Sequence, residues 1–311
     1  MNKLNNTFQN ILSIKTNCEI SNIIILKDGR ISISLNNGYI KIYKKYEYSL
    51  DLSIQVLFGF GIYYHTQLEN ENIITCNYDK KMSIIKLNTN SFQKLQVLHG
   101  HKDKVLKVIE IKDNKLISSS LDGKIKLWNL TDKNKYKCIN TIGLSEKNNY
   151  LIPILTKDNE FLCSTGENET IKFFKITSKN INLIHIIKNI KCSCGSNSII
   201  KINDIVLVGG NNFNIYIINI NNHELISILN NEINNIDSIM QLSNGNILIG
   251  GNIGIWNNEI IEYKLNNNNL IKIRNSIYAH QQTITGLIEL NDKNESVIIS
   301  CGWDMIIQFW N

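Results

Sequence analysis

Seven related segments, with equivalent residues 42 to 47 positions apart, constrain the fold of this 311-residue chain more than any other feature. The two clearest copies are KLISSSLDGKIKLWNL at 115–130 and VIISCGWDMIIQFWN at 297–311. Each copy has a serine four residues before an aspartate and a tryptophan six residues after it. These residues are Ser118, Asp122 and Trp128 in one copy and Ser300, Asp304 and Trp310 in the other. Such a regular repeat indicates an array of similar structural units.

Five weaker copies keep the spacing but lose part of this signature. Their turn residues are Asn37, Asp79, Asn168, Asn212 and Asn257. Each copy has two apolar, alternating segments joined by a turn of Asn, Asp or Gly, a pattern that predicts a β-hairpin. The copy at 246–265 fits only if its central turn is enlarged by several residues. Seven units of about 40 to 45 residues match a β-propeller built from four-stranded blades.

Residues 99–128, HGHKDKVLKVIEIKDNKLISSSLDGKIKLW, resemble a nearly complete repeat of the WD-repeat family. They contain the Gly100-His101 pair, an apolar first strand, a serine-rich second strand, an Asp-Gly turn and a terminal tryptophan. The last copy has Ala279-His280 in place of Gly-His and is otherwise similar. The resemblance covers essentially the whole chain. It implies an all-β fold, a seven-bladed β-propeller of four-stranded antiparallel blades, with residues 1–311 forming one domain.

The seventh repeat ends at Asn311, directly after its third strand, so its blade lacks an outer strand. The segment FQNILSI, at 8–14, precedes the first repeat and is not used by any other blade. We therefore expect this N-terminal segment to complete the seventh blade and close the ring. Closure also removes the exposed sheet edges that favour aggregation.

In WD-repeat proteins the histidine, serine or threonine, aspartate and tryptophan of a good repeat form a hydrogen-bonded set. The resemblance implies two such sets, which are His101, Ser118, Asp122 and Trp128, and His280, Ser300, Asp304 and Trp310. Together these side chains can satisfy one another's hydrogen bonds when buried. A catalytic Ser-His-Asp triad has the same residue types. We favour the structural interpretation because the set occurs twice at the repeat spacing and ends in tryptophan each time.

Other features limit the remaining function classes. The formal net charge is +6, but Arg30 and Arg274 are the only arginines, which disfavours a nucleic-acid-binding or phosphoinositide-binding propeller. No apolar run approaches the roughly 20 residues of a membrane span. Seven cysteines at scattered positions favour reduced thiols and an intracellular protein, either cytoplasmic or nuclear. The His99-His101 and Cys192-Cys194 pairs lack further ligands, so we expect no metal and no cofactor.

The sequence shows no catalytic constellation, and we predict a non-enzymatic scaffold for protein–protein interaction. Glu19, Glu167 and Asp237 are too few and too scattered to argue for the alternative, a propeller enzyme. His65 is expected to be a hydrogen-bonded histidine within a strand. The partners are expected to be one or more proteins, within a larger complex, that are bound through peptide segments or domains.

Partners of WD-repeat proteins commonly bind the face that carries the turns between second and third strands and the loops entering the first strands. The resemblance places on that face Tyr63, Tyr78, Lys104, Leu106, Leu121, Tyr150, Trp256 and Trp303. We expect five of them, on three consecutive blades, to form one contiguous apolar patch: Tyr63, Tyr78, Leu106, Leu121 and Tyr150. Exposed aromatic side chains on a rigid surface are frequent binding hot spots.

Overall fold

The computed structural model describes residues 7–131, 133, 135–144, 151–157, 159–165, 169–192, 197–254, 257–266, 269–274, 278–292 and 295–311. Its strands form seven four-stranded antiparallel sheets, so the predicted seven-bladed β-propeller is confirmed. The chain divides into two compact units, residues 24–190 and residues 1–23 with 191–311. The assignment of the whole chain to one domain stays a prediction. Within the described ranges, no helix has the length and apolar character needed to cross a membrane.

The first four blades lie in the unit formed by residues 24–190, although the first strand begins at Ile20. Blade one contains β2 (Ile20–Ile25), β3 (Ile31–Leu35), β4 (Tyr39–Tyr43) and β5 (Leu50–Gln55). Blade two contains β6 (Ile62–Gln67), β7 (Ile73–Asn77), β8 (Met82–Leu87) and β9 (Phe92–Leu98). Blade three contains β10 (Val105–Ile111), β11 (Lys115–Ser120), β12 (Lys124–Leu130) and β13 (Tyr136–Gly143). Blade four contains β14 (Leu151–Lys157), β15 (Glu160–Thr165), β16 (Thr170–Ile176) and β17 (Ile181–Lys188).

The last three blades lie in the unit formed by residues 1–23 and 191–311. Blade five contains β18 (Ile199–Ile202), β19 (Ile205–Gly209), β20 (Asn214–Asn219) and β21 (Glu224–Asn230). Blade six contains β22 (Asn235–Gln241), β23 (Ile247–Gly254), β24 (Asn257–Asn266) and β25 (Asn269–Arg274). Blade seven contains β26 (Ile284–Asp292), β27 (Glu295–Gly302) and β28 (Ile306–Trp310), together with β1 (Asn10–Lys15).

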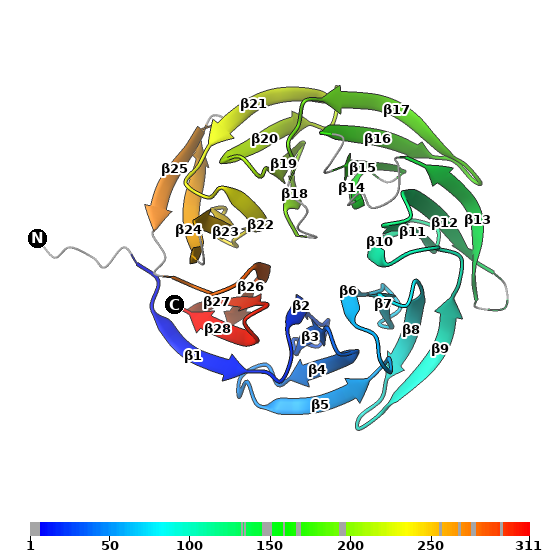
Figure 1. Cartoon of the computed structure of the whole chain (residues 1–311), viewed down its shortest axis with the longest axis horizontal. Coiled ribbons are helices and arrows are strands. Elements are labelled where there is room, and N and C mark those ends of the chain that lie inside the picture. The colour runs from blue at the N-terminus through cyan, green and yellow to red at the C-terminus, as the bar shows by residue number, and fades with distance from the viewer. Residues whose placement is uncertain are drawn as a thin grey trace, which may run out of the picture. The chain divides into compact units, whose positions relative to one another are not determined.

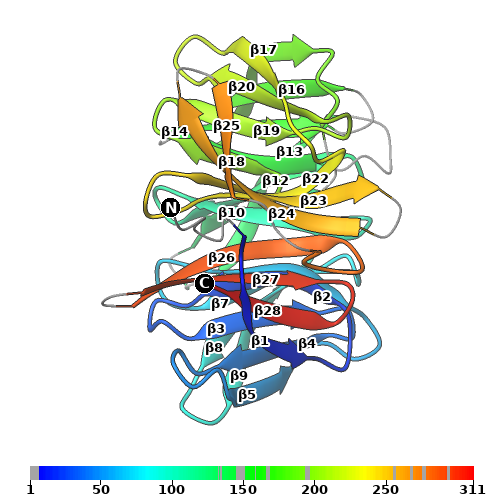
Figure 2. The ribbon, with the colours of Figure 1, turned by 90° about the vertical axis from the view of Figure 1, so that its left-hand side faces the viewer.

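The N-terminal strand completes the seventh blade, as predicted, with bounds of 10–15 in place of 8–14. β1 runs antiparallel to β28 and brings Ile14 opposite Ile307, so the N-terminal strand lies beside the C-terminal strand (Figures 1 and 2). Phe8, just before β1, is buried in the same core cluster as Trp310. The fourth strand of this blade therefore comes from the opposite end of the sequence, which closes the ring.

The turn between second and third strands explains why aspartate recurs in the sequence. In blade three the Asp122 carboxylate accepts a hydrogen bond from the Lys124 N–H at 3.0 Å, and Asp79 and Asp304 accept equivalent bonds in blades two and seven. The next residue has a positive φ in each turn, 72° at Gly123, 69° at Lys80 and 66° at Met305. An aspartate that bonds its own turn holds this tight geometry even where the glycine is missing.

Burial follows the order of strands within a blade. The second strands β3 and β7 are buried along their whole length. The outer strand β13 is mostly exposed. Core clusters contain residues of adjacent blades, and Cys76 of β7 packs in one cluster with Val108 of β10 and Trp128 of β12. Because both faces of a second strand are covered in this way, its sequence is a continuous run of apolar and small residues.

Candidate functional site

The implied hydrogen-bonded set is present in blade three. The His101 Nε2 atom lies 2.8 Å from the Ser118 Oγ atom, and the Trp128 Nε1–H donates to the same oxygen at 2.8 Å. On the other side of the ring, His101 Nδ1 lies 3.1 Å from a carboxylate oxygen of Asp122. The Lys102 N–H also donates to Asp122, at 2.8 Å. The set therefore connects the loop that precedes β10 with three other parts of the blade, which are β11, β12 and the turn between those two strands.

Blade seven repeats this geometry. His280 Nε2 lies 2.8 Å from Ser300 Oγ, which accepts a hydrogen bond from Trp310 Nε1–H at 2.9 Å. His280 Nδ1 lies 3.0 Å from the Asp304 carboxylate, and the Gln281 N–H donates to that carboxylate at 3.0 Å. The two sets thus share their connectivity although their chain segments are far apart in the sequence.

The chemistry of these sets is structural, because their buried polar groups bond to one another. Burial lowers the pKa of His101, which favours the neutral ring that its two hydrogen bonds require. Burial alone would raise the pKa of Asp122, but hydrogen bonds from His101 and from two backbone N–H groups lower it to about 2. Ser118 and Ser300 have no exposed surface. A nucleophile must reach its substrate, so two inaccessible hydroxyls oppose the triad interpretation.

His65 in β6 is buried, and its Nε2 atom lies 2.9 Å from Ser32 Oγ of β3 in the adjacent blade. Burial lowers the pKa of His65 to about 3, so the ring is neutral near pH 7. It is a structural histidine, as expected from the sequence. Asp237 in β22 differs, because burial raises the pKa of its carboxyl to about 7. Among the described residues, no group of three His, Cys, Asp or Glu side chains could hold a metal ion.

The predicted partner-binding residues have different environments. Leu106 has no exposed surface, so the prediction that it forms part of an exposed patch is wrong. It lies at a bulge of the inner strand β10, which contacts both β6 and β14, and these neighbours cover it. Tyr150 and Trp256 lie outside the described residues. Leu121 is partly exposed, and its backbone N–H donates to the Lys104 carbonyl at 3.0 Å.

Tyr63, Tyr78 and Lys104 come together at the turn-bearing end of blades two and three. The rings of Tyr63 and Tyr78 meet edge to face, with centroids 5.9 Å apart. The Lys104 ammonium group lies 4.6 Å from the centroid of the Tyr78 ring, within the range of a cation–π interaction. Gly61 allows this arrangement, since a Cβ atom there would lie 2.5 Å from the Tyr78 ring. Three of the predicted residues thus form one local cluster.

The loop between β5 and β6 adds two aromatic side chains that the sequence analysis did not select. Phe58 is 78% exposed and Phe60 is 52% exposed. This loop is fixed at the turn-bearing end, because the Val56 and Leu57 N–H groups donate to the carbonyl of Gly38 in the β3–β4 turn. In the sequence, the motif Phe-Gly-Phe-Gly at 58–61 is the feature from which these two residues could have been identified. We call Phe58, Phe60, Tyr63, Tyr78 and Lys104 the aromatic cluster.

In the other unit, Trp303 occupies the turn between β27 and β28 and is 41% exposed. Its backbone N–H donates to the Thr283 carbonyl at 3.1 Å, so the turn is held against the entry to β26. Met305 follows in the same turn and is 36% exposed. This turn therefore presents a second, smaller apolar surface.

Comparison with known proteins agrees with this geometry. Residues 92–129 and 271–311 match the family model for the WD domain, G-beta repeat, and these segments include both hydrogen-bonded sets. The structure is similar to the crystal structure of the WD40 β-propeller domain of Doa1, with a TM-score of 0.73 and 15% sequence identity. The similarity covers 98% of this chain and 97% of that domain. A search of curated proteins gave no match. The chain thus has the fold of a β-propeller, and two of its segments match the WD-repeat family.

Proposed function

We propose that this propeller is a non-enzymatic scaffold that binds peptide segments or domains of partner proteins through the aromatic cluster. The supporting observation is the high exposure of Phe58 and Phe60 in the loop that leads to Tyr63, whose ring packs against that of Tyr78. Folding alone gives no reason for two phenylalanines to remain in water on a rigid loop. Aromatic side chains in this position provide large contact area at low entropic cost, which is the character of a binding hot spot.

The charges around the cluster suggest the type of partner segment. Lys80, Lys102 and Lys104 are exposed near it, whereas the nearby Asp79 carboxylate already accepts a bond from the Lys81 N–H and lies 3.6 Å from the Lys81 ammonium group. We therefore propose that the partner offers apolar side chains flanked by acidic ones. Such pairing improves specificity and the association rate.

The arginines give little support to a propeller that binds nucleic acid or phosphoinositides. Arg30 forms ion pairs with Asp28 at 2.7 Å and with Asp51 at 2.8 Å. Arg274 lies 3.3 Å from Glu262, and its guanidinium group stacks 4.5 Å from the Phe8 ring centroid. Both are used within the fold. We also propose an intracellular location, cytoplasmic or nuclear, which rests on the scattered cysteines of the sequence.

Affinity purification with mass spectrometry tests the proposal directly. The Phe58→Ser, Phe60→Ser double variant should lose the proteins that the wild-type chain captures. Tyr46→Ser is the matched control, because Tyr46 is 59% exposed but lies between β4 and β5, away from the turn-bearing end. If the double variant captured the same proteins as wild type, partner binding through the aromatic cluster would be excluded.

A further inference from the structure

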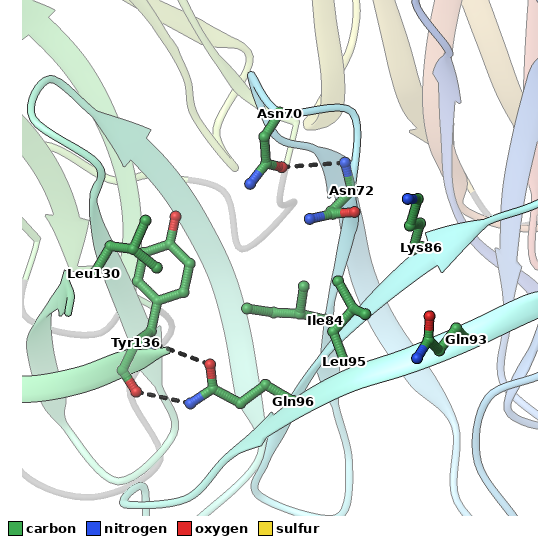
Figure 3. A pocket seen from close by; sticks show the side chains of 9 residues that line it. All are labelled: Asn70, Asn72, Ile84, Lys86, Gln93, Leu95, Gln96, Leu130 and Tyr136. Atoms are coloured by element: carbon green, nitrogen blue, oxygen red, sulfur yellow. Dashed lines mark hydrogen bonds between the residues drawn. The ribbon is translucent and has the colours of Figure 1, made fainter. Parts of the chain in front are cut away.

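A cavity of about 450 Å³ lies between the outer parts of blades two and three, at the end opposite the β7–β8 turn. Figure 3 shows the side chains that line it. Asn70 and Asn72 come from the β6–β7 turn, Ile84 and Lys86 from β8, Gln93, Leu95 and Gln96 from β9, and Leu130 and Tyr136 from the ends of β12 and β13. None of these residues belongs to the aromatic cluster.

Tyr136 is the feature of this cavity that folding does not explain. Its side chain is 5% exposed, and its hydroxyl has no hydrogen-bond partner in the structure. Burial raises the pKa of Tyr136 to about 12, with a smaller contribution from the Glu110 carboxylate, so the hydroxyl stays protonated and is a donor. A buried donor without an acceptor lowers stability. The presence of this unpaired hydroxyl in a residue that lines a cavity therefore points to a bound ligand that supplies the acceptor.

The backbone of Tyr136 is held firmly in place. The Gln96 side-chain amide donates to the Tyr136 carbonyl at 2.8 Å, and its oxygen accepts from the Tyr136 N–H at 2.9 Å (Figure 3). These bonds join β9 to β13 across the two blades. The position of Tyr136 in the wall of the cavity is therefore fixed, and its hydroxyl is buried there without a hydrogen-bond partner.

The other side chains that line the cavity indicate which kind of ligand would fit it. Lys86 is exposed and forms no ion pair with any described residue. The amides of Asn72 and Gln93 supply further donors, and none of the nine lining residues carries a carboxylate. Glu110 is outside the lining and accepts a hydrogen bond from the Glu69 N–H at 2.7 Å. Ile84, Leu95 and Leu130 provide an apolar surface between these donors.

We propose that this cavity binds a carboxylate that carries a small branched apolar group, with the carboxylate held by Tyr136 and Lys86 and the apolar group against Ile84, Leu95 and Leu130. The same chemistry is found in a free organic acid and in the C-terminal residue of a peptide. This site is separate from the proposed protein-binding surface and does not depend on it.

Calorimetric titration of the full chain with N-acetyl-leucine tests the proposal. We expect saturable binding to the wild type and at least about tenfold weaker binding to Tyr136→Phe and to Lys86→Gln, because each loses a charge-assisted hydrogen bond. N-acetyl-leucinamide, which has the same shape without the charge, should bind at least about tenfold more weakly to the wild type. The tripeptide acetyl-Ala-Ala-Leu separates the two sources, since it binds only if the cavity accepts a peptide C-terminus.

Two controls keep the test specific. Tyr43→Phe removes the hydroxyl of another buried tyrosine, on β4, and should leave the titration unchanged. Tyr136→Phe should melt at the same temperature as wild type or higher in the absence of ligand, because the deleted hydroxyl has no partner. A lower melting temperature for Tyr136→Phe would overturn the proposal, as would absence of saturation, equal binding of the acid and the amide, or wild-type affinity in Tyr136→Phe.

Discussion

Blades two and three are neighbours with the same four-stranded topology, but they differ at the entry to their first strands. The position 21 residues before the turn aspartate is His101 in blade three and Phe58 in blade two. His101 is buried and bonded to Asp122 and Ser118, whereas Phe58 is 78% exposed. The residue at this position stabilises blade three, whereas in blade two it is exposed to solvent.

The difference shows what the polar set contributes. In blade three, the set fixes the entry loop to the interior of the blade through four side chains. In blade two, Thr75 and Ile85 stand where Ser118 and Trp128 stand, so no indole N–H can donate to a hydroxyl there. The entry loop of blade two is instead held by backbone bonds to Gly38. Loss of the polar set therefore coincides with a gain of exposed aromatic surface.

The largest effect is expected from His101→Ala. The substitution removes the side-chain donor to the Asp122 carboxylate and leaves a buried charge with fewer partners, at a cost of about 3 kcal/mol in the free energy of unfolding. Chemical denaturation would measure it. Phe58→Ala, at the equivalent position of blade two, is the matched control and should change the same quantity by less than about 0.5 kcal/mol. Equal losses in the two variants would remove the distinction between the blades.

A smaller effect concerns acid sensitivity in blade two. The folded-state pKa of His65, about 3, lies below its ordinary value of 6.5. The fold thus favours the neutral ring, and its contribution is complete above pH 6.5 and is lost as the pH falls toward 3. At pH 5 the loss relative to pH 7.5 is about 2 kcal/mol.

The variant His65→Gln should reduce the pH dependence of unfolding between pH 7.5 and 5, whatever its absolute stability. His99→Gln, which changes an exposed histidine, should leave that dependence as in wild type. The readout is the difference in denaturation midpoint between the two pH values. If His65→Gln kept the full wild-type difference, the acid sensitivity would arise elsewhere in the chain.

The Ser118–Trp128 hydrogen bond of blade three should give a coupling of about 1 kcal/mol. A double-mutant cycle with Ser118→Ala and Trp128→Phe measures this term separately from the loss of packing volume. The corresponding cycle with Thr75→Ala and Ile85→Val in blade two should show coupling below about 0.5 kcal/mol. Similar coupling in both blades would mean that packing, and not the hydrogen bond, distinguishes them.

The fold could be predicted because the repeat spacing and the turn aspartates are local features that recur along the chain. The two polar sets could be inferred for the same reason, since each has its residues at fixed spacing. The proposed partner-binding surface was harder to predict, because the exposure of a side chain depends on the neighbouring blades. Leu106 matched the expected surface position but is covered by β6 and β14. Phe58 stands at the position of the repeat histidine, but the repeat signature does not indicate that an aromatic side chain there would be exposed.

The Tyr136 cavity could not be predicted from the sequence. Its lining residues come from four strands and a turn of two blades, and they range from Asn70 to Tyr136. No short motif joins them. These residues come together only when β9 packs beside β13. In the structure, two hydrogen bonds between Gln96 and Tyr136 join these strands.

The smallest effect on stability, with the largest effect on binding, is expected from the Phe58→Ser, Phe60→Ser variant. Both side chains are already mostly in water, so their loss should change the free energy of unfolding by less than about 0.5 kcal/mol. Loss of two hot-spot aromatics should weaken partner binding by about 2 kcal/mol or more. Titration with the captured partner and thermal melting of the same preparation give the two quantities. A strongly lowered melting temperature would show that the loop stabilises blade two as His101 stabilises blade three, and the proposed contrast between the two blades would be wrong.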